Sequence, residues 1–375
     1  MDSSTAEPSA AAVSLASRVR GSLMGGALGD SFGYLVASDS IAAIRARYGS
    51  AGLLDLSQAA GPVHFSDDTQ MTLYTVDALV EALEWANDGT AADETACLWL
   101  AYLRWLANQG VTPPANVPAA QPRWIDGQET LHHRRHPDGA SLSGLAGGEM
   151  GTRSRPVNPD AEGCGALSRS APFGLVPHIP AEAVYSLSTN GAALTHGHPA
   201  ALQSAAAFSW LIHRIAVENL TLQAAALSMR DRSGAEPAAD ARLLGRLDTA
   251  LELSAGQPSP AAVLGPEALT LALGSGAADQ ALGSGAADQA LAIALYAVLV
   301  TEEVSSSPVE HFLNAMRVAV NHDGNSDSTG SVAGNILGAF YGEDCLPQAW
   351  LTLSEAPGLI RAMAQQLLKV TGSRD

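Results

Sequence analysis

The sequence predicts an all-α protein that forms one compact multi-helix domain. Apolar residues recur with helical spacing from Val13 almost to the end of the chain, and strand-like alternation is nearly absent. Apolar residues make up 47% of the 375 residues, which is enough for a sizeable core. We expect the domain to cover residues 13–372. Residues 1–12 are rich in Ser, Ala and Pro and lack the basic start of a signal peptide, so we expect a disordered tail there.

Helical patterns occur along most of the chain. The amphipathic stretch at 71–85 has Leu73, Val76, Leu79, Val80 and Leu83 on one face. The other predicted helices cover approximately residues 15–36, 93–108, 181–190, 194–218, 222–231, 239–253, 290–303, 309–320 and 346–368.

Two glycine stripes interrupt these otherwise apolar patterns. Glycine occurs at every fourth position in the first helix and again near the C-terminus, at Gly21, Gly25, Gly29 and Gly33 and at Gly330, Gly334, Gly338 and Gly342. Each glycine costs a helix about 1 kcal/mol relative to alanine. A face without side chains allows a close approach of another backbone or a ligand. We therefore expect the two helices to pack against each other; the alternative is that both segments are loose.

Residues 109–163 form a long irregular insertion rich in Pro, Gly, Arg and His. Such long connections are commonly functional or disordered. Its basic run His132–His136 could contact phosphate or could simply be a solvated loop. A second irregular feature is a nine-residue unit that occurs twice in tandem, at 273–281 and 282–290, which indicates a local duplication rather than a solenoid.

Charge and cysteine usage limit the classes of function. Asp and Glu number 38 against 20 Lys and Arg, a balance that argues against nucleic acid or an anionic membrane as the main partner. The longest apolar run, 290–300, is too short to span a bilayer and is expected to be a buried helix. The three separated cysteines, Cys97, Cys164 and Cys345, suggest neither a disulfide framework nor a zinc cluster. We expect a reducing, cytoplasmic location.

Two turns rich in acidic and hydroxyl side chains precede predicted helices. They are Ser66-Asp67-Asp68-Thr69 and Asn325-Ser326-Asp327-Ser328. Each could simply cap its helix. Adjacent aspartates are costly, however, unless a cation, a helix N-terminus or a proton neutralises them. Together the turns would supply three carboxylates with hydroxyl and amide oxygens, a ligand set suited to Mg²⁺, Mn²⁺ or Ca²⁺.

Five ordered blocks of the chain resemble the ADP-ribosylglycohydrolases, relatives of dinitrogenase reductase-activating glycohydrolase. The resemblance covers approximately residues 14–342. The blocks are the glycine-striped opening with Gly29-Asp30, the turn Ser66-Asp67-Asp68, the stretch Gly163-Cys164-Gly165 to Pro172, Leu194-Thr195-His196, and Asp327-Ser328 before the second glycine stripe.

This resemblance implies an all-helical domain with two Mg²⁺ or Mn²⁺ ions in a central cleft. The implied activity is hydrolysis at the anomeric carbon of ADP-ribose, which releases ADP-ribose from a modified protein side chain or a small adduct. The implied metal ligands are Ser66, Asp67, Asp68, Asn325, Asp327 and Ser328. A carboxylate must activate the attacking water, and Asp67 or Asp68 is our candidate. The implied ADP-ribose contacts are Gly163, Cys164, Gly165, Ser168, Ser170 and His196, with backbone amides of this glycine-rich block near the diphosphate.

Three positions depart from the family pattern. Asn325 replaces the usual aspartate and brings no charge, and Ala37 stands where many members have a glutamate near the cleft. A tryptophan common before the 290–303 helix is absent from the duplicated segment. These departures leave two alternatives to an active hydrolase: a catalytically impaired member that binds ADP-ribose or acts as an interaction protein, and a purely structural all-α protein. Cys164 has no neighbouring base in its motif, so packing is favoured over nucleophilic catalysis.

Overall fold

A computed structural model describes residues 13–256, 259, 263–274 and 285–373. The expectation of an all-α domain is confirmed: the described residues form helices and short 3₁₀ turns, with two isolated β-bridges and no strand. The predicted disordered tail at 1–12 and most of the tandem duplication lie outside the described residues. No helix of the described part is long and apolar enough to cross a membrane.

The helices follow one another along the chain, with the 109–163 insertion between α4 and α6. Their bounds are α1 (Leu15–Tyr34), α2 (Ile41–Tyr48), η1 (Leu56–Gln58), α3 (Asp67–Asn87), α4 (Glu94–Asn108), η2 (Trp124–Gly127), η3 (Glu129–His132), α5 (Gly139–Ala146), α6 (Gly165–Ser168), α7 (Ala171–Gly174), α8 (Ala181–Ala193), α9 (Pro199–Ala216), α10 (Leu222–Gly234), α11 (Ala241–Ser254), α12 (Pro266–Leu273), α14 (Ala287–Glu302), α15 (Pro308–Val320), α16 (Ser326–Tyr341), η5 (Gly342–Cys345), α17 (Gln348–Leu353) and α18 (Pro357–Val370).

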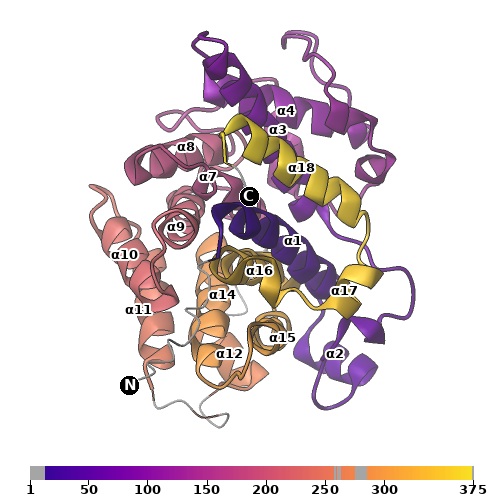
Figure 1. Ribbon diagram of the computed structural model, residues 1–375, viewed down its shortest axis with the longest axis vertical. Coiled ribbons are helices and arrows are strands. Elements are labelled where there is room, and N and C mark those ends of the chain that lie inside the picture. Colours follow the sequence, from indigo (N-terminus) through magenta and orange to yellow (C-terminus); the bar gives the residue numbers. More distant parts are fainter. Residues whose placement is uncertain (1–12, 257–258, 260–262, 275–284, 374–375) are drawn as a thin grey trace, which may run out of the picture.

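The two glycine-striped helices, α1 and α16, pack against each other at the centre of the molecule (Figure 1). Their backbones touch directly: a Cβ built on Gly29 would lie 2.0 Å from the carbonyl oxygen of Gly330, and one built on Gly33 would lie 2.0 Å from that of Ser326. The predicted contact between the stripes is therefore confirmed. The two helices meet so closely because their facing residues have no side chains.

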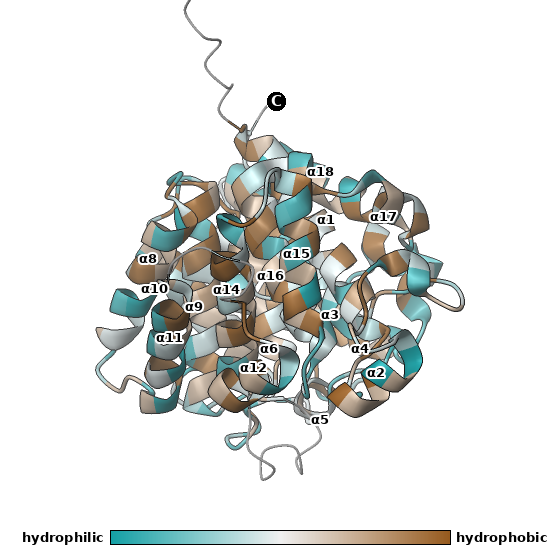
Figure 2. Ribbon diagram, turned by 90° about the horizontal axis from the view of Figure 1, so that it is seen from below, coloured by the Kyte–Doolittle hydropathy of each residue, from teal (hydrophilic) through white to brown (hydrophobic). Residues whose placement is uncertain are grey.

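The remaining helices surround this central pair. In Figure 1, α3, α4 and α18 lie on one side, α8 to α11 on a second side, and α12, α14 and α15 on a third. Figure 2 shows the central α16 largely in white and brown, whereas outer helices such as α2 and α11 carry teal hydrophilic residues. This distribution follows from burial of the apolar faces against the centre.

The C-terminal segment corrects one sequence-based expectation. We predicted a single helix over about 346–368, and the chain instead forms α17 and α18. Ala356 adopts a left-handed conformation (φ 46°) directly before Pro357. A proline disfavours helical backbone in the residue before it, so α18 begins at Pro357 instead of continuing α17.

The insertion is tied to the outer face of α3 and α4 by ion pairs. Arg123 Nε lies 2.8 Å from a carboxylate oxygen of Asp77, and Arg104 pairs with both Asp77 and Asp126. Asp77 is almost fully buried, so its charge requires these partners. The network fixes the part of the insertion around Arg123 and Asp126 against these helices.

Candidate functional site

The two acid-rich turns meet in one pocket at the junction of α1, α3 and α16. Ser328 Oγ donates a 2.7 Å hydrogen bond to the carboxylate of Asp68, joining turns that lie 260 residues apart in sequence. The pocket has a volume of about 350 Å³. We call it the carboxylate pocket, and it is lined by Tyr34, Ala37, Ser38, Asp67, Asp68, His136, Pro137, Asp138, Gly139, Cys164, Gly165, Asn325, Asp327 and Ser328.

Asp30, in α1, holds the Ser66–Thr69 turn in place through hydrogen bonds. Its fully buried carboxylate accepts hydrogen bonds from the backbone N–H of Ser66 (3.0 and 3.1 Å) and of Thr69 (3.1 Å) and from the Thr69 hydroxyl. Burial and the nearby charge of Asp327 raise the pKa of Asp30 to about 7. Glycines on either side, at 29 and 33, bring this part of α1 against α16, which places Asp30 between the two turns.

Burial and mutual repulsion disfavour the ionised forms of the aspartates in this pocket. The pKa values of Asp67 and Asp68 lie well above the usual range for aspartate, first because both carboxyls are buried and then because neighbouring carboxylates repel them. Burial also raises the pKa of Asp327. A cation bound among these groups would reverse the penalty.

Residues 133–138 of the insertion, which we call the strap, are attached to Asp67 at two points. The Asp67 N–H donates to the carbonyl of Arg135 (3.2 Å), and the Asp67 carboxylate accepts from the N–H of Asp138 (2.9 Å). Farther along α3, Gln70 Nε2 donates to the carbonyl of His133 (2.8 Å). The strap therefore forms one wall of the carboxylate pocket, a position that its irregular sequence did not reveal.

Asp138 brings a carboxylate to the pocket from this strap. It caps α5 by accepting from the Ser141 N–H (2.7 Å), and one of its oxygens lies 3.4 Å from His196 Nε2. Burial alone would raise the pKa of Asp138, but His196, Ser141 and Arg169 together hold it below its ordinary value. Asp138 is therefore expected to stay ionised while Asp67 and Asp68 favour the protonated form.

His196 lies behind this wall and does not line the pocket. Its ring is fully buried, and burial lowers its pKa to about 4. His196 Nδ1 is 2.8 Å from the hydroxyl of Thr195, which in turn accepts from Arg169 at 2.6 Å. In the structure, His196 therefore belongs to a chain of contacts that supports Asp138, and its direct contact with a ligand remains a prediction.

The glycine-rich block places only some of its residues at the pocket. Cys164 and Gly165 line it, whereas the hydroxyls of Ser168 and Ser170 donate to helical carbonyls, at 3.2 and 2.6 Å. Both serines are fully buried, and their contact with a ligand remains a prediction. Gly163 forms a β-bridge with Ala286 beside the pocket. Short hydroxyl side chains in a tight helical turn often bond to their own backbone instead of a ligand.

The donor set fits a hard divalent cation. Asp67, Asp68 and Asp327 provide carboxylates, and Asn325 and Ser328 add neutral oxygens, all on one pocket. Ser66 caps α3 by accepting from the Asp68 N–H (3.1 Å) and lies fully buried behind the two aspartates. Within the described ranges, no three His, Cys, Asp or Glu side chains already surround a single point as in a preformed metal site. The pocket thus offers ligands whose side chains would have to turn toward an ion.

Among the residues that line the pocket, the aromatic or charged side chains of Tyr34, His136 and Asp138 were not identified as site residues from sequence. Asp30, which holds the Ser66 turn without lining the pocket, was not identified either. Asp30 belonged to a motif block, and a buried aspartate within a glycine-striped helix was the available signal. His136 and Asp138 lie in a segment without periodicity. Nothing in their local pattern shows that the strap returns to Asp67.

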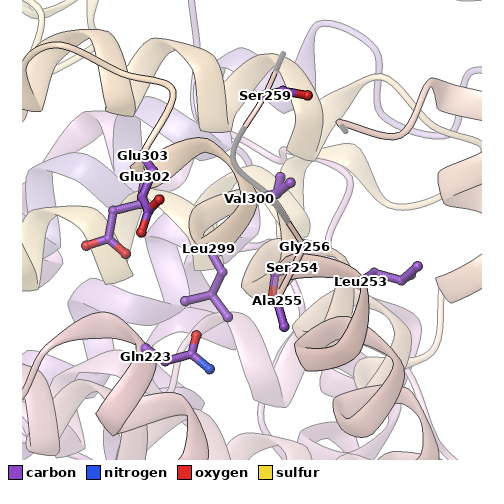
Figure 3. Close-up of a pocket in the computed structure, with 10 residues that line it drawn as sticks. All are labelled: Gln223, Leu253, Ser254, Ala255, Gly256, Ser259, Leu299, Val300, Glu302 and Glu303. Carbon is purple, nitrogen blue, oxygen red and sulfur yellow. The ribbon is translucent and has the colours of Figure 1, made fainter. Parts of the chain in front are cut away.

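A second cavity of about 240 Å³ lies between α10, α11 and α14, away from the two acidic turns (Figure 3). Leu253, Leu299 and Val300 line it together with Glu302 and Glu303. It has none of the residues of the motif blocks. The carboxylate pocket is accordingly the better candidate for chemistry.

The fold and the pocket define an all-α protein with an oxygen-rich, carboxylate-lined site of the kind used for hydrolysis. A family model described as ADP-ribosylglycohydrolase matches residues 11–375, and the chain belongs to this family. A solved structure described as an ADP-ribosylglycohydrolase-related protein complex is similar in fold, with a TM-score of 0.61, 21% identity, and coverage of 95% of this chain and 99% of that one. A search among curated proteins finds no match. Family membership supports an enzyme of the glycohydrolase type.

Proposed function

We propose that the protein is a divalent-cation-dependent hydrolase that cleaves the glycosidic bond at the anomeric carbon of ADP-ribose. Its substrate would be an ADP-ribosylated protein or a small ADP-ribose adduct. The observation that carries the proposal is the meeting of the two acidic turns in one pocket, joined by the bond from Ser328 to Asp68. Family membership supplies the ADP-ribose chemistry. Nucleic acid is not a proposed partner, because the chain carries a net charge of −18.

Two Mg²⁺ or Mn²⁺ ions are the proposed cofactors, held by Ser66, Asp67, Asp68, Asn325, Asp327 and Ser328. Bound there, they would supply positive charge for orienting ribose hydroxyls and for lowering the pKa of a water. Support comes from the raised pKa values of the buried aspartates. Their ionised forms are unfavourable without a cation, and a bound cation would stabilise them. Asn325 contributes an uncharged oxygen, which would lower the affinity of the second site for its ion.

The protein side chains would position water and accept its proton. Asp67 or Asp68 is the proposed general base. Asp67 is fixed by its two bonds to the strap, and Asp68 by its bond from Ser328, so both carboxylates are held at the pocket surface. Asp138, with its lowered pKa, provides a further ionised acceptor beside Asp67.

Cys164 is proposed to serve packing. Burial raises its pKa well above the ordinary value, and its S–H points to the carbonyl of Gly285 at 3.0 Å. A thiol kept protonated is a poor nucleophile. All three cysteines are unpaired and buried, which suits the cytoplasmic location that we propose.

A catalytically impaired, ADP-ribose-binding member is the second candidate. Ala37 and Asn325 both line the carboxylate pocket, so the two departures from the family pattern fall where they would affect chemistry. The absent tryptophan concerns the duplicated segment at 273–290, most of which lies outside the described residues.

Incubation with ADP-ribosyl-arginine, ADP-ribosyl-serine and O-acetyl-ADP-ribose, with Mg²⁺ or with EDTA, tests the proposal. We expect Mg²⁺-dependent release of ADP-ribose from at least one of them. Unchanged substrates at high enzyme concentration, with ADP-ribose still bound in calorimetry, would support the impaired member. Absence of both ADP-ribose and Mn²⁺ binding would reject any site-based function.

A further inference from the structure

An aromatic pair stands at the rim of the carboxylate pocket. Tyr34, the last residue of α1, and His136, in the strap, have ring centroids 5.7 Å apart and meet edge to face at 73°. Both residues line the pocket; Tyr34 is half-buried and His136 is exposed. The pair joins two segments about 100 positions apart in sequence, and the mechanism proposed above uses neither residue.

The protein holds His136 in place from both sides. Residues 135 and 138 are each bonded to Asp67, so His136 and Pro137 form a short projection clamped at its two ends. Arg135 is itself fixed by an ion pair to Glu355 at 2.8 Å. His136 has a left-handed backbone (φ 53°), which a residue with a side chain adopts at a cost. Such conformations persist where the surroundings impose them, and they are common at ligand sites.

Under the proposed function, the pair would lie beside the bond that is cleaved rather than beside the distant end of the substrate. Tyr34 interacts electrostatically with Asp30, Asp67 and Asp327, and His136 interacts with Asp327. If the carboxylates act at the anomeric carbon, their immediate neighbours are the ribose and the leaving group. The adenine is separated from that carbon by the ribose and the diphosphate, so it cannot occupy the same place.

We infer that Tyr34 and His136 form the wall that selects the leaving group, favouring a planar one, such as a guanidinium or a heterocycle, over an alkoxide. This inference rests on the proposed function and specifies its substrate. A flat, delocalised group can stack on the free face of either ring, and a cationic group gains further from the ring quadrupole and the surrounding carboxylates. A serine-type leaving group is small and tetrahedral and offers no surface for stacking.

The experiment compares Tyr34→Ala and His136→Ala with wild type on ADP-ribosyl-arginine and ADP-ribosyl-serine. Each variant should lower kcat/KM for the arginine adduct about tenfold while changing that for the serine adduct less than about threefold. Affinity for ADP-ribose, which has only a hydroxyl at the anomeric carbon in place of the adduct, should be unchanged in calorimetry. Tyr34→Phe and His136→Phe keep an aromatic face and should restore most of the selectivity.

His133→Ala is the matched control, because His133 is an exposed histidine of the same strap that does not line the pocket. It should behave as wild type on both adducts. Equal losses on the two adducts, no loss, or a parallel loss of ADP-ribose affinity would overturn the inference.

An inactive wild type would count against the proposed function and not by itself against the pair. In that case, the affinities of the two adducts relative to ADP-ribose decide. If wild type prefers the arginine adduct and Tyr34→Ala loses this preference, the inference is supported. Equal affinities for the two adducts, or no binding of either adduct or of ADP-ribose, would overturn it.

Discussion

Replacement of Gly29 by alanine tests whether the close contact of α1 and α16 supports both the fold and the site. The added Cβ would lie 2.0 Å from the carbonyl oxygen of Gly330, against at least 3.4 Å for an ordinary contact. The two helix backbones would have to move apart by about 1.4 Å, because the nearest atoms belong to the backbone of Gly330 and not to a flexible side chain. Overpacking of this kind costs up to about 3 kcal/mol.

Alanine also favours helix over glycine by about 1 kcal/mol, so the net loss should be about 2 kcal/mol in the free energy of unfolding. Urea denaturation followed by circular dichroism measures this loss. Since Asp30 follows Gly29 directly and holds the Ser66 turn, kcat should fall as well. Gly21→Ala, at the other end of the same contact, should destabilise comparably with a smaller effect on kcat.

Gly245→Ala is the matched control. Gly245 lies within α11, and a Cβ there would meet nothing within 4 Å, so this change should stabilise the protein by about 1 kcal/mol. If Gly29→Ala and Gly245→Ala proved equally stable, the close packing of the two stripes would be refuted as a source of stability.

Three further predictions concern charge in and near the pocket. Asp68→Asn should reduce hydrolysis at least about 100-fold with Mg²⁺ present, because it removes a proposed base and ligand; a rate near wild type would show that this turn is misassigned. Asn325→Asp should tighten Mn²⁺ binding about tenfold in calorimetry by adding one ligand charge, and unchanged affinity would remove Asn325 from the ligand set. Burial lowers the pKa of His322 to about 4, below its unfolded value of about 6.5, so the unfolded chain takes up this proton first and stability falls as pH drops through that window. His322→Gln should remove up to about 3 kcal/mol of this pH dependence between pH 6.5 and 4 in urea unfolding, and identical slopes would contradict the assignment.

The sequence already contained the helical class, the contact between the glycine stripes and the two acidic turns. These features are local or periodic: the 3.6-residue spacing of apolar side chains, glycine at every fourth position, and Ser-Asp-Asp before an amphipathic helix are each readable within a few turns of chain. Even the pairing of the stripes followed from one physical requirement, since a helix with no side chains on one face needs a backbone to cover it.

Only the tertiary structure decided how the pocket is completed. It placed the strap against Asp67 through hydrogen bonds of the strap's backbone. Because such bonds do not depend on the side chain, no residue type in 133–138 predicted them. It also placed His196 as a buried support for Asp138, and it directed the hydroxyls of Ser168 and Ser170 to backbone carbonyls four residues earlier in the chain. The Ser66–Asp68 turn was therefore predictable as a candidate cation site from its composition. Its walls, including the aromatic pair at the rim, depend on contacts between distant segments that no local pattern encodes.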